Sequence, residues 1–330
     1  MDTDTTFDHR FSFPPDSNDG LVFTKLYLSS FDTDLFSNKQ MAFGNIDVLN
    51  ADNIHIRQKI RDVMTFNNRI TGQNYYYIPT WSYIYNKGTP FYRVRKIKES
   101  EIIAPYESIK CWDDVWNPPT KYITSYGRLN YPHESLLYTT PFSPEIAIKE
   151  MKITPQDKFA LIKYEAIEDI IVTIAGFFQE NSALTTEENQ KCKVLTNFFH
   201  DNITKDISLG DEHLYKIPAN IIKECYTDYT DNSQVGWVYP SIASKKGFNV
   251  CFKPEEAKKK LKLKGTEICK LDNKYDFIIY YVIEGLEENS TMKYHLIGSE
   301  IQKSLYPHIS LTDTEIVVPV SRTGETKVQD

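Results

Sequence analysis

Two hydrophobic patterns near the amino-terminal end of the chain predict a strand followed by a helix. Residues 21–27 form an almost unbroken run of aliphatic and aromatic side chains, which is typical of a strand. Between residues 54 and 70, Ile56, Ile60 and Val63 recur at helical spacing and would line one face of an amphipathic helix. We therefore expect ordered structure to begin near residue 21 with a strand and to continue with a helix.

The central part of the chain changes from a strand-like to a helical pattern. Residues 73–87 are aromatic without a clear period, which predicts irregular structure. From 88 to 140, short apolar runs alternate with proline-containing loops, and residues 159–164 form another apolar run; both patterns predict strands. Residues 165–228 are largely helical in pattern, with helices expected from Thr186 towards His200 and from Pro218 to Tyr226.

The carboxyl-terminal third predicts one helix and two strands. Pro254 is followed by two glutamates, which is typical of the first turn of a helix. The lysine run from Lys258 to Lys264 would end that helix, where cations interact favourably with the helix dipole. Residues 275–283 and 292–297 predict strands. Taken with the preceding segments, this predicts a mixed α+β fold.

Charge and hydropathy narrow the classes of partner. The 330 residues carry a net charge of −7 with a pI near 5.6, and a protein that binds a phosphate backbone should instead be basic. No apolar run approaches the roughly 18 residues that a membrane span needs. We therefore expect neither nucleic acid nor a membrane as a partner.

Cysteine and histidine spacing indicates no metal site, and so none is predicted. The five cysteines include no C-x-x-C pair, and the seven histidines show no ligand spacing. An odd number of scattered cysteines and an acidic start without a signal-peptide pattern fit a cytoplasmic protein. Neither a dinucleotide-binding glycine motif nor a P-loop occurs.

Two neighbouring blocks combine a cation with an aromatic ring. Tyr126–Asn130 contains a glycine and carries Arg128, which predicts a turn. Leu136–Thr139 is a short apolar run that predicts a strand with Tyr138 near its end. A guanidinium group and a phenol ring therefore lie ten positions apart, one before a strand and one within it.

Two further blocks add a carboxylate and a hydroxyl group. In Ser143–Glu150, the serine suits an N-cap and Pro144 the first helical position, so Glu150 falls about two turns into a helix. Gly236–Ser241 ends in Tyr-Pro-Ser and is followed by the strand-like segment Gly247–Phe252.

In this order and at this separation, the four blocks resemble the RES domain, a family named for its arginine, glutamate and serine. The family pattern has a Gly-Arg-aromatic-Asn turn, an apolar strand ending in tyrosine, a helix with Ala-x-x-Glu, and a late Tyr-Pro-Ser before an asparagine-containing strand. Phe91–Val94 and Trp116–Pro119 also resemble family features, the first being its usual opening strand. Leu129 stands where the family commonly has an aromatic or small residue.

The resemblance implies a role in NAD cleavage for each residue that fills a family position. Glu150 would stabilise the positive charge that develops on the ribose, and Arg128 would present its planar donors to the pyrophosphate or ribose. Tyr138 would stack on the nicotinamide ring, and Ser241 would make one hydrogen bond in the same cleft. Arg93 and Asn130 are additional NAD-binding candidates by the same resemblance.

Each assignment also has a structural alternative. A lone glutamate on a helix, such as Glu150, is usually solvated, and a lone arginine, such as Arg128, more often lies at the surface or in a salt bridge. A tyrosine in an apolar strand is usually part of a core, and a serine after Tyr-Pro can serve only to form a turn. Arg93 can instead brace the opening strand through a buried ion pair. These alternatives stay open for Tyr138, Ser241 and Arg93 at the level of sequence.

The function implied by the resemblance is an NAD glycohydrolase that releases nicotinamide and ADP-ribose. NAD would be the substrate, with no further cofactor, and cleavage would pass through an oxocarbenium-like ribose. The resemblance further implies a bacterial toxin or defence effector that depletes NAD and is restrained by an antitoxin that blocks the cleft. Two alternatives stay open: an ADP-ribosyltransferase that modifies an acceptor, and a noncatalytic module that senses NAD or ADP-ribose. Self-association into a homo-oligomer is also left open.

The implied fold is ADP-ribosyltransferase-like, with a split β-sheet core and flanking helices. The resemblance covers residues 88–265, which would form the NAD-binding, catalytic domain. Residues 1–87 would form an amino-terminal α/β extension and residues 266–330 a β-rich carboxyl-terminal extension, both without an assigned role.

Overall fold

The computed structural model describes most of the chain and divides it into two compact units. The described residues are 18–69, 71–78, 80–101, 103–208, 210–227, 234–244, 247–272, 277–284, 287–288, 290–305 and 317–318. The first unit comprises Met1–Asn86, Pro118–Leu137 and Asp169–Ala257, and the second comprises Lys87–Asn117, Tyr138–Glu168 and Lys258–Asp330. Residues 88–265 contribute to both units, so this division differs from the three predicted segments.

The chain of the first unit begins with a helix, α1 (Asn18–Ser30), so the strand predicted for residues 21–27 is wrong. Thr24, Tyr27 and Leu28 are each only 1% exposed, whereas Val22 is 64% exposed. The buried positions therefore follow a helical spacing, although residues 21–27 are mostly apolar. Packing of one helix face has overridden the strand preference of the individual residues.

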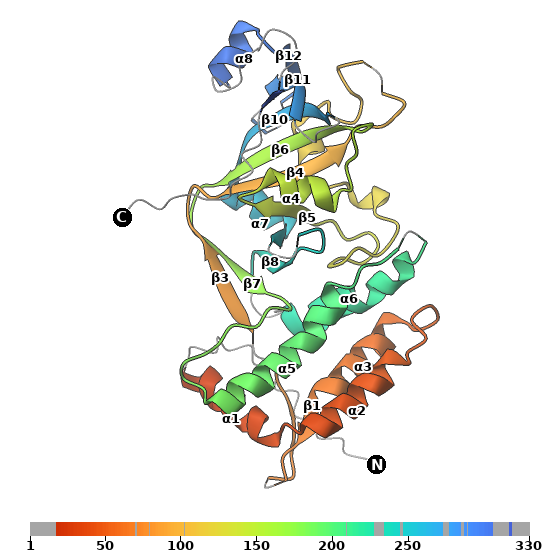
Figure 1. Ribbon diagram of the computed structural model, residues 1–330, viewed down its shortest axis with the longest axis vertical. Helices are drawn as coiled ribbons and strands as arrows, with labels where there is room; N and C mark the ends of the chain where they lie inside the picture. Colours follow the sequence, from red (N-terminus) through yellow and green to blue (C-terminus); the bar gives the residue numbers. More distant parts are fainter. Residues whose placement is uncertain are drawn as a thin grey trace. The chain divides into compact units, whose positions relative to one another are not determined.

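Helix α2 (Thr33–Gly44) and helix α3 (Asn53–Met64) pack against each other, as Figure 1 shows. Each begins at an aspartate that accepts a backbone N–H: Asp32 from Leu35 and Asp52 from His55. The helix predicted for residues 54–70 is confirmed up to Met64.

The helix ends there because the chain enters a short hairpin of β1 (Thr65–Asn67) and β2 (Asn74–Tyr76). Together with β3 (Trp81–Tyr85), this hairpin replaces the irregular structure predicted for residues 73–87.

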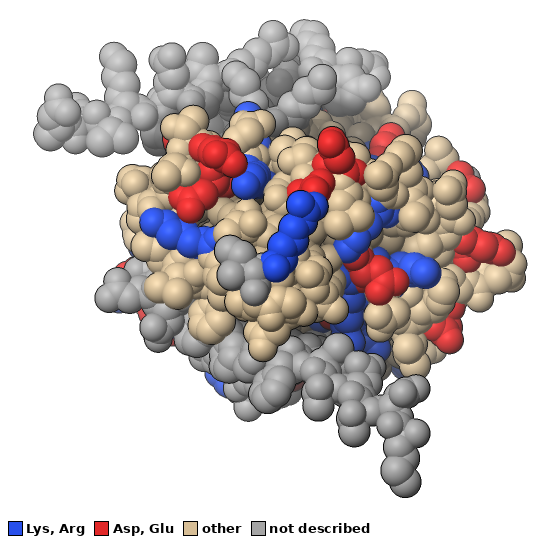
Figure 2. All heavy atoms as spheres, turned by 90° about the horizontal axis from the view of Figure 1, so that it is seen from below, with Lys and Arg blue, Asp and Glu red and all other residues tan. Residues whose placement is uncertain are grey.

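Figure 2 shows lysine and arginine interspersed with aspartate and glutamate on the face that it draws.

The predicted helices after residue 185 are confirmed. Helix α5 (Thr186–Ile203) begins with a capping box in which Thr185 and Glu188 satisfy each other's backbone N–H groups. A 3₁₀ turn, η3 (Glu212–Tyr215), leads into α6 (Lys216–Ile221), which continues as a π-helical turn, η4 (Ile222–Tyr226).

The larger sheet of the first unit has the order β9-β8-β7-β3. Its remaining strands are β7 (Ile170–Ile174), β8 (Gly236–Pro240) and β9 (Phe248–Phe252); β7 and β8 are parallel and the other pairs antiparallel. Strand β7 corrects the largely helical prediction for residues 165–228, because its burial alternates with period two. A Cβ atom at Gly236 would lie 2.9 Å from the Phe252 Cα and closer still to the Cys251 carbonyl oxygen, so β8 needs glycine there.

The sheet of the second unit is antiparallel, with the order β12-β11-β10-β6-β4-β5, and β13 also pairs with β11. The strands are β4 (Pro90–Lys96), β5 (Leu137–Pro141), β6 (Lys158–Ala166), β10 (Leu261–Leu271), β11 (Phe277–Glu284), β12 (Lys293–Leu296) and β13 (Val317–Val318). The strands predicted at 159–164 and 292–297 are confirmed, and so is most of that at 275–283. Short helices complete the described elements: η1 (Trp112–Val115), η2 (Thr120–Tyr122), α4 (Pro144–Glu150), α7 (Pro254–Lys260) and α8 (Glu300–Leu305).

The lysine run is predicted to lie at the end of a helix, but only its first part does. The run crosses from a helix into a strand. Helix α7 begins at the predicted proline and ends at Lys260, and β10, the longest of the described strands, begins at Leu261. Exposed Lys262 and Lys264 alternate with buried Leu261 and Leu263, so this part of the run follows a strand period.

Helix α4 covers the sheet of the second unit and buries an apolar core. Ala147 and Ile148 of α4 pack with Val94, Leu161 and Val282 of the sheet. The predicted mixed α+β class is confirmed by these helices and sheets.

Candidate functional site

The six candidate residues are divided between the two units. Arg128, Asn130 and Ser241 belong to the first unit, and Arg93, Tyr138 and Glu150 belong to the second. Their local surroundings are therefore described unit by unit.

Arg128 lies on a turn that is closed by a 3.0 Å hydrogen bond from Gly127 N to Asn130 O. Its Nη1 donates to the carbonyl oxygen of Ile203, the last residue of α5, and at 3.2 Å to that of Lys205. The guanidinium carbon also lies 5.2 Å from the centre of the Tyr215 ring. Arg128 thus caps the carbonyl end of α5, where a positive charge is favourable.

Two tyrosine hydroxyls and two asparagine amides hold the loop that carries Arg128. Tyr126 donates its hydroxyl to Asn53 Oδ1 at 3.0 Å, and Tyr131 donates to Asn220 Oδ1 at 2.6 Å. Asn220 is fully buried and donates in turn to the same Asn53 oxygen at 2.8 Å. The loop is therefore fastened at two points to α3 and α6, on either side of Arg128.

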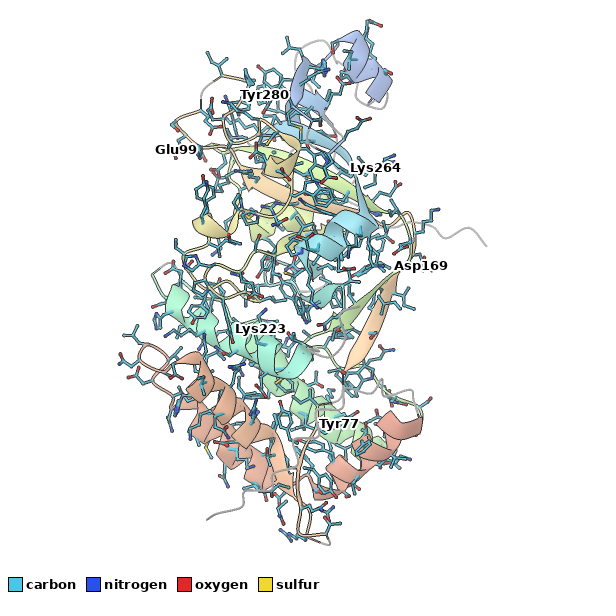
Figure 3. All side chains as sticks on the ribbon, turned by 180° about the vertical axis from the view of Figure 1, so that it is seen from behind. Tyr77, Glu99, Asp169, Lys223, Lys264 and Tyr280 are labelled. Carbon is cyan, nitrogen blue, oxygen red and sulfur yellow. The ribbon has the colours of Figure 1, made fainter. Side chains whose placement is uncertain are left out.

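An ion pair between a buried lysine and a half-buried glutamate adds a third attachment to this loop. Lys223, marked in Figure 3, pairs with Glu134, and its side chain is only 9% exposed. The lysine Nζ lies 5.8 Å from the Tyr131 ring centre and 5.5 Å from that of Trp237. Glu134 also accepts the backbone N–H of Tyr131 at 2.9 Å. Sequence reasoning missed this group, because its members are far apart in the chain and follow no motif.

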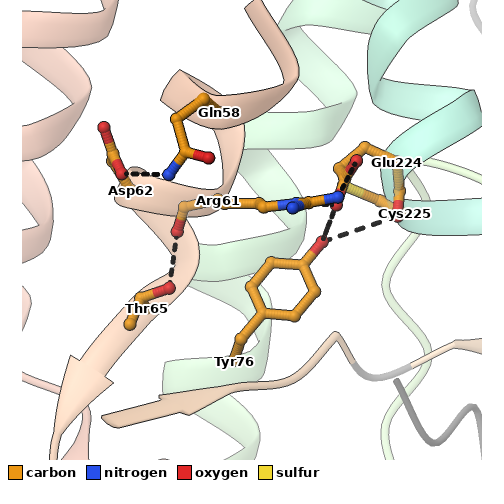
Figure 4. A network of polar contacts seen from close by, with 7 residues as sticks. All are labelled: Gln58, Arg61, Asp62, Thr65, Tyr76, Glu224 and Cys225. Carbon is orange, nitrogen blue, oxygen red and sulfur yellow. Dashed lines mark hydrogen bonds and ion pairs between the residues drawn. The ribbon is translucent and has the colours of Figure 1, made fainter. Parts of the chain in front are cut away.

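The neighbouring residue on the π-helical turn, Glu224, is part of a separate network (Figure 4). Its side chain is 1% exposed and accepts two hydrogen bonds from Arg61, at 2.6 and 3.2 Å. Tyr76 donates to it at 3.3 Å and lies 4.0 Å from the Cys225 sulfur. Burial and the nearby negative charge raise the pKa of both Tyr76 and Cys225. The thiol is therefore held neutral, and the network ties α3 and β2 to η4.

Ser241 follows β8 and is 5% exposed. Its backbone N–H donates to Gly247 O at 2.8 Å, and its hydroxyl accepts the N–H of Ser244 at 3.0 Å. Both contacts belong to the connection between β8 and β9, so the turn-forming alternative describes part of its role. Asn249 of β9 is also buried, opposite Tyr239 of β8.

In the second unit, Tyr138 is half-buried and is the second residue of β5, near the beginning of the strand rather than near its end as predicted. Glu150 is the half-buried last residue of α4. Ser143 is the N-cap residue, as expected, but its hydroxyl donates to Glu145 at 2.5 Å instead of capping a backbone N–H.

Arg93 lies on β4, opposite Ile162 in the sheet register, and its positive charge moderates the pKa of Tyr164, which burial raises. This electrostatic effect on Tyr164 is internal to the second unit and is not the ion pair of the bracing alternative.

Glu267 is a titratable group in the second unit that sequence reasoning also missed. It lies on the face of β10 that is covered by α4, in register with Leu161 and Val282. Within the described part of the chain, no group hydrogen-bonds to its carboxylate. Burial raises the pKa of Glu267 to about 7, and the positive charge of Lys163 opposes this shift.

A cavity of about 100 Å³ lies within the first unit, near the end of α5. Its lining is mainly apolar: Phe43, Gly44, Ile46, Val48, Ile207, Leu214, Ile217 and Pro218, with Asn202 and Lys205. The six candidate residues are not among its lining residues, and it is far smaller than a dinucleotide site of several hundred Å³.

Searches for metal-binding clusters and membrane spans found neither in the described residues. No group of three or more histidine, cysteine, aspartate or glutamate residues there is arranged to hold a metal ion. No helix in the described ranges is both long and apolar enough to cross a membrane.

Comparisons with models of known protein families, with curated proteins and with solved structures yield no match to the chain. The RES resemblance therefore depends on the four sequence blocks themselves.

Proposed function

We propose that this protein is an NAD glycohydrolase that cleaves the bond between nicotinamide and ribose. Glu150 stabilises the developing positive charge on the ribose, and Tyr138 stacks on the departing nicotinamide. Ser241 hydrogen-bonds to the substrate, and Arg128, with Arg93 and Asn130, binds its phosphates or ribose. Water is the acceptor, so the products are nicotinamide and ADP-ribose.

One observation carries this proposal: each of the four residues that give the resemblance lies on the type of local element that the family pattern requires. Arg128 is on a closed turn, Tyr138 on a strand, Glu150 on a proline-led helix and Ser241 just after a strand. Tyr138 departs from the pattern in lying near the beginning of its strand. The other three agreements, in the same order along the chain, support the resemblance more than any one residue does.

The position of Glu150 adds a second, physical argument. A carboxylate at the last residue of a helix faces the negative end of the helix dipole, which costs roughly 0.3–1 kcal/mol. The helix dipole therefore does not favour a glutamate at this position, which is compatible with a catalytic carboxylate.

The capping contacts of Arg128 modify the role proposed for it. One terminal nitrogen is engaged by α5, so the guanidinium is oriented by the protein before any substrate binds. An arginine held in this way loses little side-chain entropy on binding an anion. The cap therefore supports a preorganised binding group.

The direct test incubates the purified full-length protein with NAD and quantifies nicotinamide and ADP-ribose by chromatography. Hydrolysis predicts equal amounts of both products. Label transferred from NAD to a macromolecule would support the ADP-ribosyltransferase instead. Binding without turnover would support the sensing module, and either outcome would overturn the proposal.

Substitution of Glu150 by glutamine tests the mechanism, since it keeps the shape of the side chain and removes its charge. We expect turnover to fall by at least about 100-fold with the fold intact. Glu145→Gln, in the first turn of the same helix, is the matched control and should keep most of the activity. Wild-type turnover in Glu150→Gln would exclude this mechanism.

As a cellular role, we propose that the enzyme depletes NAD as a toxin or defence effector in the bacterial cytoplasm. An antitoxin that occludes the substrate cleft is the partner that such an activity requires. Expression of the wild-type chain should lower cellular NAD and stop growth, and expression of Glu150→Gln should do neither.

A further inference from the structure

Strand β3 is an outer strand without the usual protection. Among the described strands it pairs only with β7, and it contains neither a charged residue nor a proline. Natural sheets commonly protect such strands with lysine, proline or a bulge. The outer strand of the second unit, β12, follows that rule with Lys293 and His295. Strand β3 is therefore chemically suited to pair with a further strand.

An apolar row extends across β3 and β7 on one face of the sheet. Ile84 lies directly opposite Ile171 in the register, and the two side chains are 55% and 56% exposed. Tyr83, on the other face of β3, is 47% exposed. Both faces of this strand thus present large apolar side chains.

We propose that two copies of this chain associate through antiparallel pairing of their β3 strands, with Ile84 opposite Ile84 of the second copy. A two-fold axis at this position makes the contact self-complementary. It joins the two short rows into one row of four isoleucines, from Ile171 of one copy to Ile171 of the other. Cross-strand pairs of β-branched residues stabilise a sheet.

Charge favours a second copy over a charged peptide as the occupant. No charged side chain lies between Trp81 and Asn86, so the two-fold pairing brings no like charges together. A charged peptide would find no opposite charge along this strand. The net charge of −7 on each copy opposes association, but salt screens charges more than about 8 Å apart at physiological ionic strength.

The size of the contact sets the expected strength. A single pair of five-residue strands buries less than the roughly 1,200 Å² that stable interfaces reach, so the dimer should dissociate in the micromolar range. Sedimentation velocity of the full-length protein from about 1 to about 200 µM covers that range. We expect the sedimentation coefficient of the wild-type protein to rise with concentration from the monomer towards the dimer value.

A charge exchange at the proposed axis tests the register. Ile84→Lys and Ile84→Asp should each weaken self-association at least about tenfold, because each brings two like charges together. A mixture of the two variants should dimerise again. Ile54→Lys, at a position that is 72% exposed on α3 of the same unit, is the control and should dimerise as the wild type does. Far-UV circular dichroism verifies that all variants are folded.

Three results would overturn this proposal. The first is a wild-type protein that stays monomeric at about 200 µM. The second is an Ile84→Lys variant that associates as strongly as the wild type. The third is a mixture of folded Ile84→Lys and Ile84→Asp that sediments as monomers, which would exclude pairing about Ile84.

Discussion

Glu267 offers a quantitative test of how the second unit is packed. Its pKa rises from an ordinary value of 4.5 to about 7 because folding removes the carboxylate from water. At about 1.4 kcal/mol per pKa unit, a shift of about 2.5 units corresponds to roughly 3 kcal/mol, which is an upper value for a half-buried group. Above pH 7, the ionised carboxylate should therefore destabilise the folded protein by up to that amount.

The sign of the pH dependence follows from proton binding. Between about pH 4.5 and 7 the folded state binds more protons at Glu267 than the unfolded state does, so stability falls as pH rises. Glu267→Gln cannot ionise and should lack this contribution. Relative to wild type, we expect the variant to gain up to about 3 kcal/mol at pH 8 and almost nothing at pH 4.5.

Urea unfolding of both proteins at several pH values between 4.5 and 8 measures this difference. The difference between variant and wild type matters, because other groups titrate equally in both. Glu165→Gln on the neighbouring strand is the control: its ion pair with Lys264 is 3.3 Å long and exposed, so its effect should stay within about 1 kcal/mol. A flat difference between Glu267→Gln and wild type would refute the proposed burial of an ionisable carboxyl group.

Three further substitutions test the first unit. Arg128→Lys should weaken NAD binding and lower the urea midpoint, since lysine cannot reproduce the planar donor group; unchanged affinity with reduced stability would leave only the capping role. Lys223→Met should cost roughly 1–3 kcal/mol because it leaves the half-buried carboxylate of Glu134 without this partner, and adding Glu134→Leu should restore part of the loss; additive losses in urea unfolding would contradict the pairing. Gly236→Ala should give little soluble protein, because its Cβ would overlap the backbone of β9; wild-type thermal stability would contradict that geometry.

Elements with a clear local signal could be predicted from the sequence. The capping box at Thr185 predicts the start of helix α5, and prolines in the first turns predict the starts of α4 and α7. Strand β6 contains the apolar run Phe159–Ile162, and most of its residues are buried. In these segments, propensity, pattern and packing agree, so the local pattern suffices.

Other elements are determined by packing that the sequence does not display. Residues 21–27 have the composition of a strand, yet contacts on one side select a helix. In sequence, the lysines of β10 resemble the end of a helix. Pairing with β6 places them in a strand, where exposed and buried residues alternate. Here tertiary contacts decide the outcome, and they cannot be derived from one short window.

In the candidate site, too, some features follow from local sequence and others depend on contacts between distant residues. The turn of Arg128 and the helix of Glu150 follow from local pattern. The partners that hold the Arg128 loop could not be predicted, since Asn53 and Asn220 are separated by 167 residues in sequence. Glu267 carries no local signal either, because its perturbed pKa arises from burial.

The π-helical turn makes the order of two adjacent residues significant. Lys223 faces the acid Glu134, while Glu224 faces the base Arg61. Exchanging the two would leave composition, length and net charge untouched, yet each charge would meet another of its own sign. Sequence statistics that count residues without their order would regard such a chain as equivalent, although its interior would be electrostatically inverted.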